Sequence, residues 1–511
     1  MIHFQLTPHD LPNNVCAMKN YILSIDQGTT GTTVLIVDRE LNIKAKVNQE
    51  FTQHYPQPGW VEHSANEIWD SVVVTIQKAL QQAGLAAEDI AAIGITNQRE
   101  TTVAWQRSTG EPIHHAIVWQ DRRTADVCAC LKKKGLLKKI RRTTGLVLDP
   151  YFSGTKMGWL MKNVLAARVL VKKNDLAFGT IDSWLVWKLT AGAQHVTDVS
   201  NASRTLLMNL KTLAWDDSLL KIFGVPKQTL PKICSSSEIY GHTKNIQGLC
   251  DGIPIAGIAG DQQAALFGQA CFAPGEAKCT YGTGSFLLMN IGKKFVAPKT
   301  GLLTTVAWKI GKQVNYALEG SAFIAGAAVQ WLRDELKIIS SANQIEELAK
   351  TVADNGGVYF VPALAGLGSP HWDPYARGVI CGLTRGSRQG HLARATLEGI
   401  AYSQYDILLA MQKESGKKLK KLKVDGGAVA NDLLMQFQSD ILDADLIRPK
   451  VIETTALGAA FLAGLAVGMW SSQKEIASTF GVDKHFVPGM KKAERQRLIA
   501  GWQSALQKAR G

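Results

Sequence analysis

Residues 26–33 and 280–285 form two short loops, rich in glycine and threonine, that are suited to binding phosphate. Each lies between two short apolar runs, a pattern that predicts a β-hairpin with a polar turn. Glycine lets a backbone approach a ligand closely, and free amides and hydroxyl groups bind phosphate oxygens. Asp26, at the end of the first strand, could hold Mg²⁺ through water. Ordinary tight turns use the same residue types, so one loop alone leaves both interpretations open; its recurrence favours phosphate.

A polar cluster at residues 96–102 follows the predicted buried strand 91–95. In α/β folds ligand-binding groups gather where strands end, so this cluster is a candidate site. Arg99 and Glu100 within it could bind neighbouring hydroxyl groups, with one side chain donating and the other accepting hydrogen bonds. A surface ion pair is the alternative.

The order of strand, aromatic residue and charged cluster recurs at residues 118–123. Trp119 could pack there against a small carbon skeleton, although a position in the core is the commoner role of tryptophan. Tyr151 lies in the segment 149–160, which opens a predicted helix.

Asp261 lies at a predicted strand-to-helix corner. The apolar strand 253–259 leads into Gly260, Asp261, Gln262 and Gln263, where a helix over residues 262–272 is predicted to begin. An aspartate in such a place is most often a plain helix N-cap, and catalysis is the alternative.

Two corners in the C-terminal half could receive a nucleotide. Residues 319–330 lead into a helix whose small residues permit close approach, and residues 424–431 place a pair of glycines after a strand. The glycine pair could leave room for a nucleoside, with Asn431 reading a polar edge. A simple helix N-cap turn is the alternative.

The length of 511 residues suits two domains of roughly 250 residues each. Hydrophobic residues make up 46% and charged residues 20%, an ordinary composition for a soluble globular protein. The net charge is +14, but the basic runs are not interleaved with aromatic residues, so we expect no nucleic-acid partner. The basic segment 131–142 is expected to form an amphipathic surface helix.

The apolar run 456–470 is too short to cross a bilayer and is expected to form a buried helix, so no membrane span is expected. The eight cysteines show neither a pairing pattern nor metal-ligand spacing, which indicates free thiols in a reducing cytoplasm. Residues 1–20 lack the apolar core of a secretory signal and are expected to be a flexible N-terminal extension.

Several of these segments together resemble the carbohydrate-kinase family called FGGY. The resemblance rests on residues 26–30, 97–102, 119–120 and 151–159, while the segments 151–163 and 378–398 are similar to the two family signatures. It extends from about Tyr21 to Trp502, in order through both halves of the chain.

The resemblance implies an α/β fold of two actin-like, ribonuclease H-like ATPase domains with an interdomain cleft. Residues 21–270 would form the N-terminal domain, which binds glycerol, phosphate and Mg²⁺, and residues 271–511 the nucleotide-binding C-terminal domain. The implied activity is transfer of a phosphoryl group from ATP to glycerol, giving sn-glycerol 3-phosphate. The family also implies a homo-oligomer, either a dimer or a tetramer.

The same resemblance implies individual roles. Asp261 would be the general base, and Asp26 would support Mg²⁺. The implied glycerol pocket is lined by Arg99, Glu100, Trp119, Tyr151, Asp261 and Gln262. The residues implied to bind the nucleotide and its phosphates are Thr29, Thr30, Gly31, Gly282, Thr283, Gly326, Gln330, Gly427 and Asn431.

Position 33 departs from the family pattern. Members commonly continue with Ser-Ser-Arg where this chain has Gly31, Thr32 and Thr33. The arginine that could contact a nucleotide phosphate is therefore missing. Weaker ATP binding is the most that we expect from this change. Two other functions remain open: a kinase of the same family acting on xylulose, ribulose or gluconate, and a non-catalytic actin-like nucleotide-binding module. The cluster 97–102 with Trp119 favours glycerol, and Asp261 with both loops argues against the module.

Overall fold

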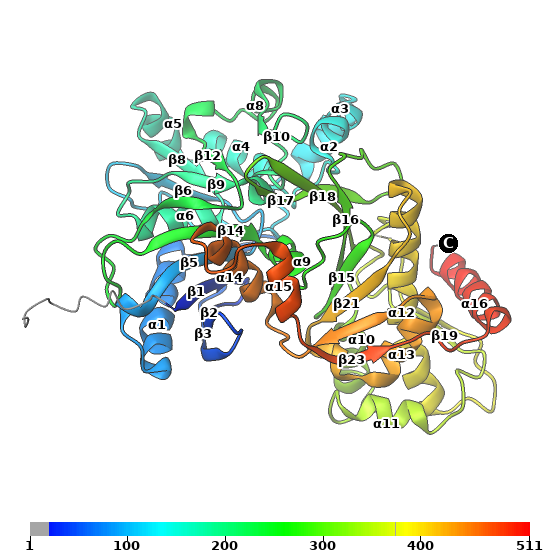
Figure 1. Ribbon diagram of the computed structural model, residues 1–511. Coiled ribbons are helices and arrows are strands. Elements are labelled where there is room, and N and C mark those ends of the chain that lie inside the picture. The colour runs from blue at the N-terminus through cyan, green and yellow to red at the C-terminus, as the bar shows by residue number, and fades with distance from the viewer. Residues whose placement is uncertain (1–19, 374, 511) are drawn as a thin grey trace, which may run out of the picture.

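The computed structural model describes residues 20–373 and 375–510, which form two lobes joined by one continuous mixed sheet of 13 strands (Figure 1). In spatial order the strands are β23 (Val482–Phe486), β22 (Leu446–Pro449), β21 (Lys421–Asp425), β15 (Glu276–Tyr281), β16 (Ser285–Gly292), β18 (Gln313–Ala322), β17 (Leu303–Ile310), β13 (Ser237–His242), β14 (Pro254–Gly260), β5 (Ile90–Asn97), β1 (Tyr21–Gln27), β2 (Gly31–Asp38) and β3 (Ile43–Glu50).

Helices and short strand pairs surround this sheet. The helices are α1 (Ala65–Ala83), α2 (Ala125–Lys133), α3 (Leu137–Thr144), α4 (Ser153–Asn163), α5 (Leu165–Lys172), α6 (Ile181–Leu189), α7 (Val199–Ala202), α8 (Asp217–Phe223), α9 (Asp261–Gly268), α10 (Gly326–Asp334), α11 (Gln344–Lys350), α12 (Gln389–Ser415), α13 (Asp432–Leu442), α14 (Thr454–Ala466), α15 (Gln473–Thr479) and α16 (Lys492–Arg510). The short pairs are β4 (Glu62–His63) with β7 (Ala116–Ile117), β6 (Val103–Gln106) with β8 (Leu176–Gly179), β9 (Val196–Asp198) with β12 (Lys232–Cys234), β10 (Met208–Asn209) with β11 (Ala214–Trp215), and β19 (Tyr359–Val361) with β20 (Val379–Cys381).

Both predicted hairpins are confirmed, one in each lobe. Strand β1 pairs antiparallel with β2, and β15 pairs antiparallel with β16. The two turns close in the same way, because the amide of Gly28 donates to the carbonyl of Gly31 and the amide of Gly282 to that of Gly284, both at 2.9 Å. The hydroxyl-bearing residues of each loop therefore lie on a rigid turn rather than on a free loop.

Helices α9 and α14 pack against each other between the lobes (Figure 1). Helix α14 comes from late in the chain but covers strands of the first lobe, where Ser24 Oγ donates to the carbonyl of Ala456 at 2.7 Å. The two helix backbones nearly touch, since a Cβ on Gly458 would lie 1.9 Å from the carbonyl oxygen of Ala264. Because α9 begins at Asp261, this contact fixes the position of the candidate base.

Two predicted helices differ in the structure. The segment 131–142 is not one helix, because α2 and α3 are separated by Gly135 in the left-handed region at φ 73°. The helix predicted over 262–272 ends at Gly268, and Ala270 then turns the chain at φ 48°. The apolar run from residue 456 forms the buried helix α14, as expected.

No helix within residues 20–373 and 375–510 has the length and apolar character needed to span a bilayer. The seven cysteines among these residues are free. The expected N-terminal extension lies outside the described residues, apart from residue 20.

Gly458→Ala is expected to destabilise the protein by about 2–4 kcal/mol. The new methyl group would overlap the Ala264 carbonyl, which belongs to a helix backbone and cannot rotate away. Urea or thermal unfolding measures the loss.

Gly386→Ala is the matched control, because a Cβ at Gly386 would meet nothing closer than the Thr384 hydroxyl at 3.8 Å. Its Tm should stay within about 2 °C of the wild-type value. Equal stability of the two variants would contradict the close contact between α9 and α14.

Candidate active site

Five charged side chains meet where the two lobes join. Arg99 Nε lies 2.9 Å from Asp261 Oδ1, and Arg99 Nη1 lies 2.5 Å from Glu319 Oε2. Arg204 pairs with Glu100 at 2.6 Å and with Glu319 at 2.9 Å. The five side chains, here called the charge network, form one continuous series in which Glu319 holds both guanidinium groups.

Asp261 is the only member of the charge network that solvent reaches appreciably. Its side chain is 33% exposed, whereas those of the other four are at most 3% exposed. Burial alone would raise the pKa of Glu319, but Arg204 and Arg99 lower it to about 2. Burial raises the pKa of Glu100, against the opposing effect of Arg204. Asp261 is therefore the carboxylate of this network that a ligand can contact.

The charge network draws on segments far apart in the sequence. Arg99 and Glu100 follow β5, Asp261 opens α9, Arg204 follows α7, and Glu319 lies on β18. Glu100 has a left-handed backbone, with φ 61°, which turns the chain directly after Arg99. The surface ion pair considered for Arg99 and Glu100 is wrong, because both are buried and each pairs with a partner in another segment.

An aromatic wall borders the charge network and the first loop. The rings of Trp119 and Tyr151 meet edge to face, with centroids 5.5 Å apart. Trp119 Nε1 donates to Thr29 Oγ1 at 2.9 Å, and the Arg204 guanidinium lies 5.8 Å from the Tyr151 ring centroid. Trp119 is half-buried rather than part of the core. This wall presents apolar ring surface next to the charged groups.

Gln262 connects Asp261 to the second hairpin. Its Oε1 accepts a hydrogen bond from Lys278 Nζ, and Lys278 also donates to Thr280 Oγ1 at 2.9 Å. Lys278 lies on β15 and is fully buried. With the charge network and the aromatic wall, this link joins all six residues of the predicted glycerol pocket into one connected set.

No role was predicted from the sequence for Arg204, Glu319 or Lys278. Glu319 is the one charged residue of β18, and Lys278 lies between two apolar residues of β15, a signal that could have marked them. Arg204 lies in the mostly polar run 200–205, and only the structure reveals that this run is buried.

The residues predicted in the first loop differ in exposure. Thr30 is exposed, and Thr29 is half-buried against Trp119. Gly31 is buried as the first residue of β2 and pairs with Glu50 of β3. Gly31 therefore serves the hairpin, and the threonines are the residues that a phosphate can reach.

Asp26 lies opposite Thr33 in the first hairpin. Burial and repulsion from Asp261 and Glu453 raise the pKa of Asp26 to about 7, against the attraction of Lys46. A cation at Asp26 would relieve this repulsion, so the residue fits the predicted Mg²⁺ role. Residues 20–373 and 375–510 contain no cluster of three or more potential metal-binding side chains.

The second loop packs on the start of α10. The carbonyl groups of Gly282 and Thr283 accept hydrogen bonds from the amides of Gly326 and Ala325, at 2.9 and 2.8 Å. Gly282 and Thr283 are exposed, as is Gln330 one turn further along α10. These predicted nucleotide-binding residues thus form one exposed corner of the second lobe.

The helix N-cap predicted as the alternative role of Asn431 is confirmed, because its Oδ1 accepts a hydrogen bond from the amide of Leu434 at 2.8 Å. Only its Nδ2 is then left to donate to a ligand. Gly427 is exposed, and a Cβ there would meet no atom within 4 Å. The turn therefore has both a structural role and open space in front of it.

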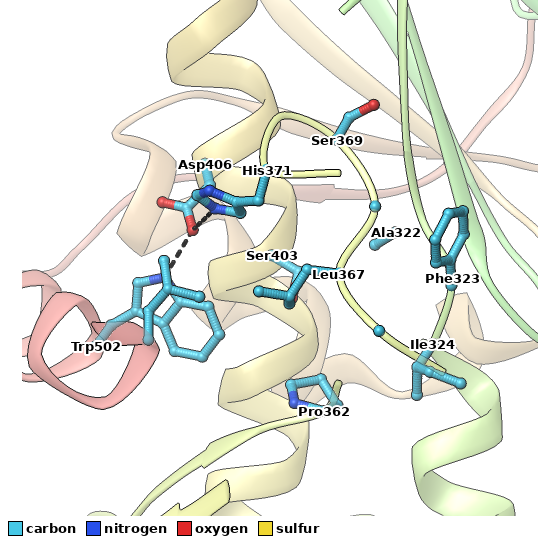
Figure 2. A pocket seen from close by; sticks show the side chains of 13 residues that line it. Ala322, Phe323, Ile324, Pro362, Leu367, Ser369, His371, Ser403, Asp406 and Trp502 are labelled. Atoms are coloured by element: carbon cyan, nitrogen blue, oxygen red, sulfur yellow. Dashed lines mark hydrogen bonds and ion pairs between the residues drawn. The ribbon is translucent and has the colours of Figure 1, made fainter. Parts of the chain in front are cut away.

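A separate small cavity lies beside Phe323 in the second lobe (Figure 2). Its volume of about 20 Å³ suits a single water molecule, whereas small-molecule sites have about 300–1,000 Å³. Asp406 at this cavity accepts a hydrogen bond from Trp502 Nε1 at 2.8 Å and lies 3.8 Å from His371 Nε2. We assign the cavity to packing around α12 and α16, not to substrate binding.

Comparison with known proteins covers both halves of the chain. The N-terminal domain model of the FGGY family of carbohydrate kinases matches residues 21–268, and the C-terminal domain model matches residues 277–467. Glycerol kinase of Caldanaerobacter subterraneus subsp. tengcongensis is 58% identical over 493 residues, which cover 96% of this chain and 99% of that protein.

Solved structures of other kinases are similar over nearly the whole chain. Plasmodium falciparum glycerol kinase with ADP has a TM-score of 0.91 at 38% identity, and gluconate kinase from Lactobacillus acidophilus has a TM-score of 0.86 at 26% identity. Each match covers 96% of this chain and 98% of the other. The expected two-domain α/β fold is thus confirmed, and because the two family models together span most of its length, the chain belongs to the FGGY family of carbohydrate kinases.

Proposed function

We propose that this protein transfers the γ-phosphoryl group of ATP to glycerol, giving sn-glycerol 3-phosphate and ADP. The observation that carries the proposal is the placement of Asp261, the exposed end of an otherwise buried charge network. It lies close enough to Asp26 of the first hairpin to raise that residue's pKa, and Gln262 and Lys278 link it to the second hairpin. An acceptor hydroxyl at Asp261 would therefore lie near both phosphate loops.

Glycerol is favoured over a longer sugar acid or ketose. The aromatic wall of Trp119 and Tyr151 suits a short carbon skeleton, while Asp261 and Gln262 offer polar atoms to its hydroxyl groups. The curated relative named above is a glycerol kinase at 58% identity, whereas the gluconate kinase structure is only 26% identical.

Asp261 is the general base in this mechanism. It accepts the proton of the acceptor hydroxyl as that oxygen bonds to the γ-phosphorus, while the bond from this phosphorus to the bridging oxygen of ADP breaks. Arg99 orients the Asp261 carboxylate through Nε, and its remaining contacts with Glu319 and Gln263 fix the guanidinium. Protein groups thus mainly position the reactants.

The nucleotide would lie along the second lobe, with its phosphates reaching the first hairpin. The hydroxyl groups of Thr29, Thr30 and Thr283 would contact its phosphates, and the open turn at Gly427 and Asn431 would receive the nucleoside. Asp26 would hold Mg²⁺, which when bound neutralises charge on the phosphate oxygens. We further propose a division near residue 270 into glycerol-binding and nucleotide-binding domains, a cytoplasmic location and a homo-oligomeric state, each extended from the family.

ADP release with glycerol, dihydroxyacetone, xylulose, ribulose and gluconate tests the function. We expect turnover with glycerol at a far lower KM than with the others. Preferential use of one of the sugars would assign the chain to another kinase of the family. Absence of turnover with the whole panel would favour the non-catalytic module.

Asp261→Asn is expected to lower kcat by about 10²–10⁴-fold, with a much smaller change in glycerol KM. Asparagine retains the shape and a hydrogen-bonding oxygen but cannot accept the proton. Steady-state kinetics with glycerol measures both parameters. A variant with near wild-type kcat would remove Asp261 from the role of base.

Glu319→Gln is expected to cost about 3–5 kcal/mol of stability, because both buried arginines lose the charge of the carboxylate that they share. In the fraction that stays folded, glycerol KM should rise about tenfold or more as Arg99 loses its anchor. Unfolding curves and kinetics at low temperature separate the two effects.

Glu398→Gln provides a matched control for Glu319. Glu398 is a buried carboxylate that pairs with a single arginine, Arg394, outside the charge network. Its loss should cost less stability and leave glycerol KM unchanged. A similar KM change in both variants would show that the Glu319 effect is not specific to the site.

Asp26→Asn is expected to abolish most activity yet stabilise the metal-free protein at pH 8 by about 1–2 kcal/mol. The folded pKa of Asp26, about 7, exceeds the ordinary value of 3.8, so the ionised carboxyl costs stability. That cost is complete above pH 7, shrinks as the pH falls, and vanishes below about pH 3.8. Unfolding in EDTA at pH 8 and pH 5 should therefore show a larger gain at pH 8, and an unchanged Tm at pH 8 would contradict the assignment.

A further inference from the structure

Lys278 is a fully buried lysine without a carboxylate partner in the part of the chain that the structure describes. Its ammonium donates to two neutral oxygens, Gln262 Oε1 and Thr280 Oγ1. A buried charge is costly, and such lysines are usually paired with an acid. Its two acceptors are side chains of the candidate site, which distinguishes Lys278 from a buried lysine that donates only to backbone carbonyls.

The bond between Lys278 and Gln262 determines how the Gln262 amide is oriented. An ammonium group has donors only, so the carbonyl oxygen of the amide must face it, and the NH₂ group must face away. A neutral hydroxyl in the place of Lys278 could accept as well as donate, and would allow either orientation. Within residues 20–373 and 375–510, Gln262 Nε2 has no hydrogen-bond partner.

Gln262 is half-buried and directly follows Asp261 in the first turn of α9. Lys278 comes from β15, whose far end begins the second loop. The hydrogen bond thus connects the proposed acceptor pocket to the hairpin that carries the proposed phosphate residues.

We propose that Lys278 is a positioning residue that locks the Gln262 amide with its NH₂ group presented to an oxygen of the acceptor substrate. The proposal deepens the proposed function and rests on it for the place of Gln262 in the pocket. Lys278 acts through Gln262, so the two side chains should behave as one unit in substrate binding. Specificity for a hydroxyl oxygen follows, because the site then offers a donor at Gln262 beside an acceptor at Asp261.

The test compares wild type, Lys278→Met, Gln262→Leu and the double variant in glycerol kinetics. Lys278→Met should raise glycerol KM about tenfold and change ATP KM less than about threefold. The double variant should match Gln262→Leu within about twofold, because a lysine that acts through an absent amide has nothing further to lose. The proposal would be overturned if Lys278→Met kept glycerol KM within twofold of the wild-type value. It would also be overturned if the KM effects of the two single substitutions multiplied in the double variant.

Lys423→Met is the matched structural control. Lys423 lies directly opposite Lys278 on the neighbouring strand β21, is also buried, and donates only to the backbone carbonyls of Gln269 and Ala270. Both lysine variants are expected to lower Tm, but only Lys278→Met should raise glycerol KM. An equal rise in both would assign Lys278 to structure alone.

Gln262→Glu keeps the proposal testable if Lys278→Met does not fold. Glutamate retains an oxygen for Lys278 and forms a buried ion pair with it, but replaces the NH₂ donor by a second acceptor oxygen. Folding should be preserved while glycerol KM rises at least tenfold. An unchanged KM would overturn the proposal. The proposed function is decided separately, by the activity of the wild-type protein with the panel of acceptors. If the wild-type protein prefers another acceptor, the same variants are compared by their KM for that acceptor.

Discussion

The pairing of Glu319 with Arg99 and Arg204 is the interaction on which the site depends. Ions taken out of water cost several kcal/mol each, and they are tolerated only when every partner is in place. Glu319 lies on β18, whereas the arginines follow β5 and α7, so Glu319 reaches both guanidinium groups only after the two lobes have folded onto each other. The orientation of Arg99, and with it that of Asp261, is thereby tied to the complete tertiary structure.

The backbone around the charge network is equally constrained. Helix α9 can carry Asp261 at the junction because Gly458 of α14 lets the two helices touch, and α14 in turn is held on β1 by the Ser24 hydroxyl. The continuous sheet then connects both phosphate-type hairpins to the same scaffold. Candidate site residues from the two halves of the chain lie on regular elements or directly after them, which holds geometry better than mobile loops do.

The sequence predicted features that are encoded locally. Apolar runs around glycine and threonine were sufficient for both hairpins, and the apolar run from residue 456 was sufficient for α14. Helix ends were wrong where one residue takes a left-handed backbone, as Gly135 and Ala270 do. The role expected of Arg99 came first from its place after a buried strand, and that of Asp261 from family resemblance. No local pattern could assign their partners, since 220 positions separate Arg99 from Glu319.

Thr33, the departure from the family pattern, affects the charge balance at the first hairpin. Thr33 faces Asp26 across the β1–β2 pair, so an arginine at this position would have placed a cation beside that carboxylate. In this chain Thr33 instead accepts a hydrogen bond from Asn48 at 2.9 Å, and the nearby Lys46 is already paired with Glu453. The high pKa of Asp26 is the consequence of burial and repulsion that no protein cation offsets in full. A cation bound beside Asp26 would supply the compensation that Thr33 does not.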